Sequence, residues 1–235
     1  LVGACAAIPG IVDPVEGTVL LSRPFGLRDF PLARELAPGR GFPFIVENDA
    51  NACAWERLAS ARTEPVSDFI CVLARAWEDP RAVEGASGEG AYGKDGSNEG
   101  GGLATGAGLG IALGGRVHYG SLYAAGEIAD AEGRSPGDLS GADRDRSFGA
   151  FVERTFRALV PVVAALAPGA VFACGEFRRR EAETRAALDA RFPALREILA
   201  AHGATLVFAG SGGHDVAEGA CATFLSRLFA VPELS

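Results

Sequence analysis

Several residue types and patterns are scarce or missing in this 235-residue sequence, and each absence narrows the class of protein. There is no Met, Lys94 is the single lysine, and no apolar run approaches the roughly 20 residues that a membrane-spanning helix needs. The first residues also lack the pattern of a signal peptide. Because the chain opens within an apolar stretch and without Met, we expect further residues upstream of Leu1. These absences favour a cytoplasmic protein without a membrane segment.

Closely spaced cysteines are missing as well. The five cysteines form no C-x-x-C pair, and most of them lie inside apolar runs: Cys5, Cys53, Cys71, Cys174 and Cys221. This pattern predicts buried free thiols in a reducing compartment, with neither a disulfide framework nor a cysteine metal site. The net charge of −8 argues against DNA binding by these residues, since phosphate contacts need clustered Lys and Arg. We therefore expect contact with DNA only through a region outside this chain.

The residues that are present are typical of an α/β protein with one large domain or two lobes. The sequence is 48% hydrophobic and long enough to bury a sizeable core. Apolar runs predict strands at 1–8, 18–21, 42–46, 68–74, 170–174 and 205–209. Helical periodicity predicts helices at 30–36, 50–61, 148–166, 178–201 with a break at Pro193, and 215–229. Asp29 is the expected N-cap of the first helix, and Gly114-Gly115 is the expected turn of a hairpin.

One junction combines a buried strand, a helix and three polar side chains. The apolar run that ends at Val46 is followed by Glu47, Asn48 and Asp49, and helical periodicity begins directly after them. Ligands bind at the carboxyl ends of strands in open α/β sheets, where a carboxylate can accept a proton and an amide can orient a hydroxyl. The alternative is that Asn48 or Asp49 only caps the helix. From these residues alone, capping is the favoured interpretation.

Three stretches together carry a resemblance to a known family. They are AAIPGIVDPVEGTVL (6–20), FPFIVENDANACA (42–54) and TGAGLGIALGGRVHYGSLYAAGEIAD (105–130). Their order and approximate spacing resemble the ROK family (repressor, open reading frame, sugar kinase), which contains sugar kinases and sugar-responsive repressors. The resemblance covers nearly the whole chain, down to a closing segment that looks like the terminal helix of the family.

The resemblance implies an α/β fold of the two-lobed, actin/hexokinase-like (ribonuclease H-like) type, with the N-terminal part of the first lobe missing from this chain. Residues 1–48 would be the remainder of the N-terminal lobe, and residues 49–214 would form the C-terminal lobe. The terminal segment 215–235 would return to the first lobe. The Gly-rich segment 75–102 is then an insertion, which we expect to be a loop without a core of its own.

The resemblance also implies a sugar site at the junction described above. In the family, residues matching Asn48 and Asp49 hold sugar hydroxyls, and the Asp is the catalytic base of the kinases. Glu127 matches a further sugar-binding Glu, although a solvated loop carboxylate is the alternative for it. This implication now outweighs the capping interpretation of Asp49.

The stretch that begins at Thr105 resembles the second phosphate loop of the family. Its candidate phosphate-binding residues are Thr105, Gly106 and Gly108, since glycines let backbone N–H groups approach a phosphate. Gly-rich hairpins serve structure as often as ligands, so a structural role is the alternative.

The departures from the family pattern concern the nucleotide and zinc sites. The first phosphate loop is not in this chain, Ala104 stands where Gly is expected, and the insertion 75–102 precedes the second loop. The Gly-Gly that approaches adenosine in the kinases corresponds to 174–176, which reads Cys-Gly-Glu. Asp130 stands in place of a zinc-binding His, and the following cysteines are absent, so we expect no zinc. For His118, the imidazole in this motif, a role in hairpin packing or on the surface is expected.

A chain that keeps the sugar residues but lacks the nucleotide elements favours a sensor. We therefore expect the effector domain of a ROK-type transcriptional regulator, with its DNA-binding helix-turn-helix upstream. Its partners would be a sugar or sugar phosphate and a second copy of the chain in a homodimer. One alternative is a sugar kinase, which would need ATP and Mg²⁺. The other is a degenerate domain that only mediates dimerisation.

Overall fold

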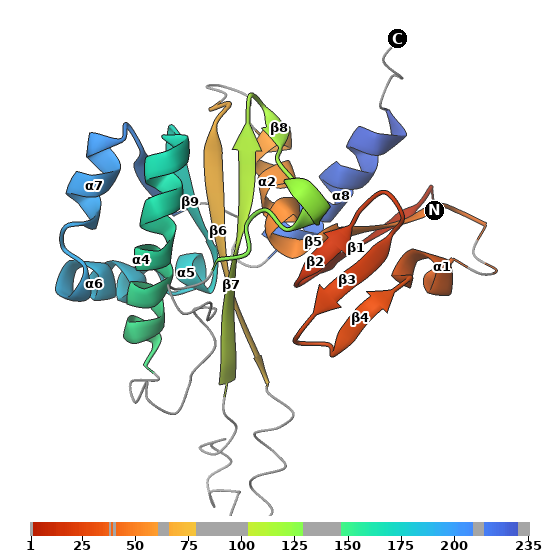
Figure 1. The fold of residues 1–235 in the computed structure, drawn as a ribbon, viewed down its shortest axis with the longest axis horizontal. Coiled ribbons are helices and arrows are strands. Elements are labelled where there is room, and N and C mark those ends of the chain that lie inside the picture. Colours follow the sequence, from red (N-terminus) through yellow and green to blue (C-terminus); the bar gives the residue numbers. More distant parts are fainter. Residues whose placement is uncertain are drawn as a thin grey trace, which may run out of the picture.

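Three sheets and the helices packed on them make up the computed structural model (Figure 1). It describes residues 2–37, 39, 41–60, 66–78, 103–128, 147–208 and 214–229, without the side chains of 76–78 and 103–105. The largest sheet has five strands in the order β10 (Thr205–Phe208), β9 (Ala170–Gly175), β6 (Phe69–Glu78), β7 (Leu103–Leu113) and β8 (Arg116–Val117). The strands β10, β9 and β6 run parallel, and β7 and β8 complete an antiparallel edge.

The two smaller sheets come from the N-terminal residues. Strand β1 (Ala4–Ile8) pairs in parallel with β5 (Phe44–Asn48). Strands β2 (Ile11–Asp13), β3 (Thr18–Ser22) and β4 (Leu27–Phe30) form an antiparallel sheet, followed by the short helix α1 (Leu32–Leu36). A small core of Val12, Val19 and Val46 joins the two sheets, so both belong to one packed unit.

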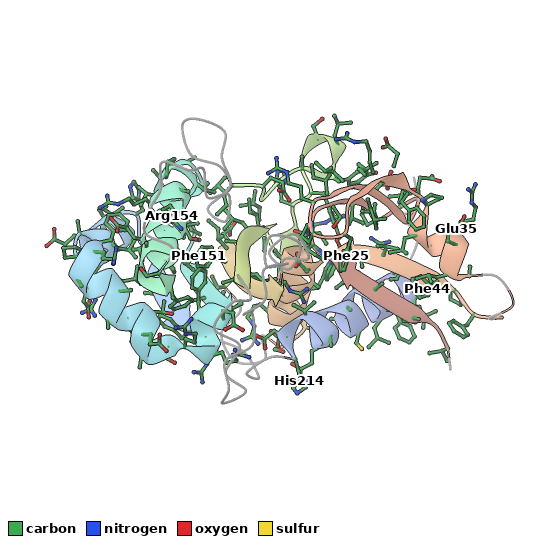
Figure 2. All side chains as sticks on the ribbon, turned by 90° about the horizontal axis from the view of Figure 1, so that it is seen from below. Phe25, Glu35, Phe44, Phe151, Arg154 and His214 are labelled. Atoms are coloured by element: carbon green, nitrogen blue, oxygen red, sulfur yellow. The ribbon has the colours of Figure 1, made fainter. Side chains whose placement is uncertain are left out.

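Alternating side chains give the five-stranded sheet two apolar faces. On one face, Ile70 and Val72 pack with α4 (Phe148–Leu166), whose Phe151 and Phe156 are buried. The helices α5 (Glu176–Arg179), α6 (Glu181–Arg191) and α7 (Leu195–Ala201) lie on the same side of the sheet (Figure 1). Figure 2 shows Phe151 among these helices, at the opposite end of the molecule from Glu35 of α1.

The helices α2 (Asp49–Ser60) and α8 (Asp215–Leu228) lie between the five-stranded sheet and the β1–β5 pair (Figure 1). Cys53 and Ala54 of α2 pack against the other face of the sheet. The crossing of the two helices is close at Gly219, because a Cβ there would lie 1.8 Å from the carbonyl oxygen of Ala52. The position therefore admits no side chain without a shift of backbone.

Most predicted elements are confirmed, and three differ. The helix 148–166, the strands at 170–175 and 205–208, and the Gly114-Gly115 turn are observed as expected. Asp29 is not an N-cap: it lies in β4 with a φ of 48°, and no side chain caps α1, which follows Pro31.

The segment 178–201 contains parts of three helices, because the chain breaks at Arg180 as well as near Pro193. The expectation of a loop from residue 75 is also wrong at its start. Strand β6 continues through Glu78, and β6 and β7 extend together beyond the other strands (Figure 1). The rest of the insertion, 79–102, lies outside the described residues.

Candidate functional site

The junction between β5 and α2 holds two of the predicted site residues side by side. The Asn48 side-chain oxygen accepts from the Asn51 backbone N–H at 2.9 Å, and its amide nitrogen donates to the Gly10 carbonyl at 2.7 Å. Asp49 is the first residue of α2, and its Oδ1 accepts from the Ala50 N–H at 2.8 Å. Asn48 therefore supplies the cap of the helix, whereas Asp49 keeps its second oxygen for another partner.

That second oxygen faces Arg75 of β6. The Arg75 Nε lies 3.3 Å from Asp49 Oδ2, and the Asp49 side chain is only 8% exposed. Burial raises the pKa of Asp49, because a carboxylate loses hydration there, and the positive charge of Arg75 opposes this rise. Arg75 is the first residue of the Gly-rich segment 75–102 and belongs to no recognisable motif, so the sequence alone does not mark it as a site residue.

The stretch that resembles a phosphate loop is a strand and not a loop. Thr105, Gly106 and Gly108 all lie in β7, and Gly106 stands directly opposite Arg75 in the β6–β7 ladder. Two glycines of the stretch face helix α2. A Cβ on Gly108 would lie 3.5 Å from the Ala50 Cβ, which is ordinary contact, and a Cβ on Gly110 would lie 2.1 Å from the Ala50 carbonyl oxygen. Gly110 thus lets the first turn of α2 approach the strand, and phosphate binding stays a prediction.

Glu127 is brought to the same region through a contact with β7. The Leu109 N–H donates to the Gly126 carbonyl at 2.9 Å, and a Cβ on Gly126 would meet the Leu109 oxygen at 1.9 Å. Gly126 has a φ of 93°, which a larger residue rarely adopts. Glu127 is exposed, yet desolvation of its carboxyl by the surrounding chain and then the charge of Asp49 raise its pKa, while Arg23 lowers it. The carboxylates of Asp49 and Glu127 are therefore near enough to repel each other.

A second buried carboxylate, Glu47, lies directly before this site; the sequence places it at the junction but assigns it no role. Its side chain is fully buried, and its oxygens accept from the Tyr119 hydroxyl at 2.7 Å and the Asn48 N–H at 2.8 Å. Trp55 Nε1 donates to the Tyr119 oxygen at 3.1 Å, and the Arg227 guanidinium lies 3.7 Å from Glu47. Burial raises the pKa of Glu47 despite these partners. An acidic residue at the end of an apolar strand was the signal available in the sequence.

Three of the five cysteines lie together where helix α2 packs on the five-stranded sheet. Cys53, Cys71 and Cys174 are buried, and hydrogen bonds from the other two thiols lower the pKa of Cys174. The prediction of buried free thiols is confirmed for these three and wrong for Cys221, which is exposed. Within the described ranges, no group of three or more His, Cys, Asp or Glu side chains is arranged to hold a metal ion. The expectation about zinc falls on Asp130, which lies outside those ranges together with residues 131–146.

His118 is exposed, and its backbone N–H bonds to the Ile111 carbonyl at 2.7 Å within the hairpin. A search of the described helices for a membrane span finds none of sufficient length and apolarity.

The arrangement of sheets and helices identifies the fold class of this chain. Its sheets and helices form the two-lobed α/β fold of the actin/hexokinase type, as the ROK resemblance predicted. No protein-family model and no curated protein matches the sequence.

Among solved structures, a ROK family glucokinase from Streptomyces griseus, in complex with glucose and AMPPNP, matches with a TM-score of 0.62 at 19% identity. The match covers 94% of this chain and 80% of that one.

Two further ROK structures match this fold. For the ROK hexokinase from Thermus thermophilus the TM-score is 0.57 at 20% identity, over 94% of this chain and 78% of that chain. A ROK family transcriptional regulator, a homolog of the E. coli Mlc protein, has a TM-score of 0.55 at 15% identity, over 94% of this chain and 62% of the regulator. Kinases and a regulator therefore share this fold, and the likeness confirms the predicted fold.

Proposed function

We propose that this chain is a ROK family member that serves as the sugar-sensing effector domain of a transcriptional regulator. Asn48, Asp49 and Glu127 would bind the sugar, with both carboxylates accepting hydrogen bonds from its hydroxyls. The proposal is supported by the position of Asn48 and Asp49 at the β5–α2 junction, by the effect of the Asp49 charge on Glu127, and by a fold shared with a glucokinase solved with glucose.

One observation favours a sensor over a kinase. The stretch that resembles a phosphate loop is paired with β6 from Leu103 to Ala112, and its Gly110 makes room for helix α2. Phosphoryl transfer needs backbone N–H groups gathered around the phosphates in addition to a base and a metal. A strand engaged in a ladder does not offer such a turn, whereas binding of sugar hydroxyls by Asp49 does not require it.

In this proposal, residues 1–48 with 215–235 and residues 49–214 act as two lobes that close on the sugar. A ligand that binds the closed form more tightly shifts the population toward it. The closed form would change the geometry of a homodimer, and a helix-turn-helix upstream would transmit the change to DNA. The sensor would be cytoplasmic and would need no cofactor.

Calorimetry on the purified protein tests the proposal against a panel of hexoses and N-acetylated hexosamines. Each charge-assisted bond contributes about 1.5–3 kcal/mol, so Asp49→Ala and Glu127→Ala should each weaken binding roughly tenfold to a hundredfold. Glu35→Ala is the matched control, because its carboxylate is exposed on α1 and pairs there with Arg34. Absence of sugar binding, or binding indifferent to both substitutions, would favour a domain that only mediates dimerisation.

The kinase alternative is favoured by one comparison. The matching glucokinase was solved with glucose and AMPPNP, and Asp49 occupies the position that the resemblance assigns to a catalytic base. A kinase would require ATP and Mg²⁺, and Thr105, Gly106 and Gly108 would then contact phosphate. Sugar-dependent ATP hydrolysis that is lost in Asp49→Asn would establish this alternative over the sensor.

A further inference from the structure

The Asp49–Arg75 pair gives the proposed sugar site a second component. Asp49 would have to accept hydrogen bonds as a carboxylate, yet its side chain is only 8% exposed. A carboxylate so poorly hydrated tends to take up a proton unless a positive charge or donors stabilise it. One donor and one cation are present among the described residues: the Ala50 N–H lies 2.8 Å from Oδ1, and the Arg75 Nε lies 3.3 Å from Oδ2 as an ion pair.

The sheet fixes where the Arg75 side chain lies. Directly opposed residues of a ladder share a face, and residues two apart on a strand share it too. Arg75 is opposite Gly106, and Gly108 on the same face of β7 contacts Ala50 of α2. The Arg75 side chain therefore emerges on the side of the sheet that α2 covers, beside the first turn of that helix. The position follows from strand register and needs no rearrangement to reach Asp49.

Among the described residues, Glu127, Arg23 and Cys53 are further charged or titratable groups near the pair. Glu127, from the segment held against β7, repels Asp49, and Arg23 from the β3–β4 turn stabilises Glu127. Cys53, one turn further along α2, is buried and has its pKa raised. Glu127 thus adds to the tendency of Asp49 to take up a proton, and Arg75 is the cation that opposes it.

We propose that Arg75 is a positioning residue that favours the ionised form of Asp49 and fixes its orientation, so that the sugar affinity persists to lower pH than it would without this arginine. The inference rests on the proposed function, in which Asp49 accepts a sugar hydroxyl. With a donor on Oδ1 and a cation beside Oδ2, the carboxylate has a defined orientation toward the ligand. Arg75 touches Asp49 and acts through it.

The sign of the pH effect follows from the electrostatics. Burial raises the pKa of Asp49 and Arg75 lowers it, so replacing Arg75 with neutral Gln raises that pKa further. In Arg75→Gln, the fraction of ionised Asp49 then begins to decline at a higher pH than in the wild type, where Arg75 opposes the effect of burial.

The first experiment is calorimetric titration with the tightest-binding hexose of the panel between about pH 8 and about pH 6, where an ionised fraction can fall about tenfold per pH unit below its pKa. We expect the affinity of Arg75→Gln to fall at a higher pH, and therefore by a larger factor over this range, than the affinity of the wild type. Arg75→Lys restores a positive charge and should move the profile back toward that of the wild type. Arg196→Gln is the control, since this exposed arginine pairs with Asp189 on the far helices. Parallel profiles for wild type and Arg75→Gln would overturn the inference.

The second experiment needs no sugar, so its outcome is separate from that of the proposed function. Urea denaturation of wild type, Arg75→Gln, Asp49→Asn and the double variant forms a cycle. The loss of urea midpoint in Arg75→Gln should be larger at about pH 8 than at about pH 5, because the unpaired carboxylate is ionised at the higher pH. In the Asp49→Asn background, this pH dependence should vanish.

If no hexose binds, the proposed function fails and the denaturation cycle alone decides the inference. If Arg75→Gln does not fold but the double variant does, the unpaired carboxylate is the cause, as the inference requires. If neither folds, or if the pH dependence persists in the Asp49→Asn background, Arg75 acts independently of Asp49 and the inference is wrong.

Discussion

The two glycines of β7 that face α2 provide a sharp test of how the strand carries the site. Gly108 and Gly110 lie two residues apart on one face, but a Cβ would fit at the first and collide at the second. The nearest atom to it is the Ala50 Cβ at 3.5 Å for Gly108, which is ordinary contact, and the Ala50 carbonyl oxygen at 2.1 Å for Gly110. The obstructing atom is backbone, so it cannot move aside as the end of a flexible side chain would.

Gly110→Ala should therefore displace the first turn of α2, which carries Asp49. Overpacking of this kind costs typically 1–3 kcal/mol and occasionally more, and we expect about 3 kcal/mol here because backbone must shift. For a chain of this size, that corresponds to a fall in the melting temperature of roughly 6–12 °C. Gly108→Ala should be neutral or stabilising by up to about 1 kcal/mol, since alanine lowers the entropy of the unfolded chain.

The assay is thermal denaturation followed by circular dichroism, with the two variants measured beside the wild type. Equal melting temperatures for Gly110→Ala and wild type would refute the packing role of this position. Equal losses in both variants would show that the strand tolerates no side chain on this face, and the distinction drawn from the two distances would be wrong.

Two further predictions concern the buried carboxylate Glu47. Tyr119→Phe removes the hydroxyl that donates to Glu47 and should lower the free energy of unfolding in urea by about 1–3 kcal/mol; an unchanged value would show that water replaces the donor. Because burial raises the pKa of Glu47 and Glu127 above their ordinary value of 4.5, the folded state binds more protons than the unfolded state. The free energy of unfolding should therefore fall as pH rises from about 5 to about 8, and a series of urea titrations that shows an increase would contradict this.

The β5–α2 junction was predictable because its signals are local. An apolar run followed by Asn48 and Asp49 and then helical periodicity specifies a strand, a cap and a helix, and all three are observed. The strands and helices of the second half were predictable for the same reason. The resemblance of three stretches then predicted the fold that the solved structures share.

The remaining features depend on contacts that local patterns do not contain. The pairing of Arg75 with Asp49 follows from the register of β6 against β7, and a side chain next to a Gly-rich segment gave no sign of it. The glycines after Thr105 resemble a phosphate-binding motif, whereas Gly110 is required because helix α2, which is distant in sequence, packs against the strand there. Asp29 has a residue type that suits an N-cap, but residues 27–30 pair with β3 as strand β4, so helix α1 begins only at Leu32.

The packing of α8 against the N-terminal strands has a consequence for the order of folding. Phe224 lies where a Cβ on Gly3 would clash, and Arg227 bonds to the Pro14 carbonyl 213 positions away. Contacts of such long sequence separation close the largest loops and form late. During synthesis, α8 emerges only after the strands of the five-stranded sheet. Because this helix covers the β1–β5 pair, we expect the N-terminal strands to expose apolar surface until it is made.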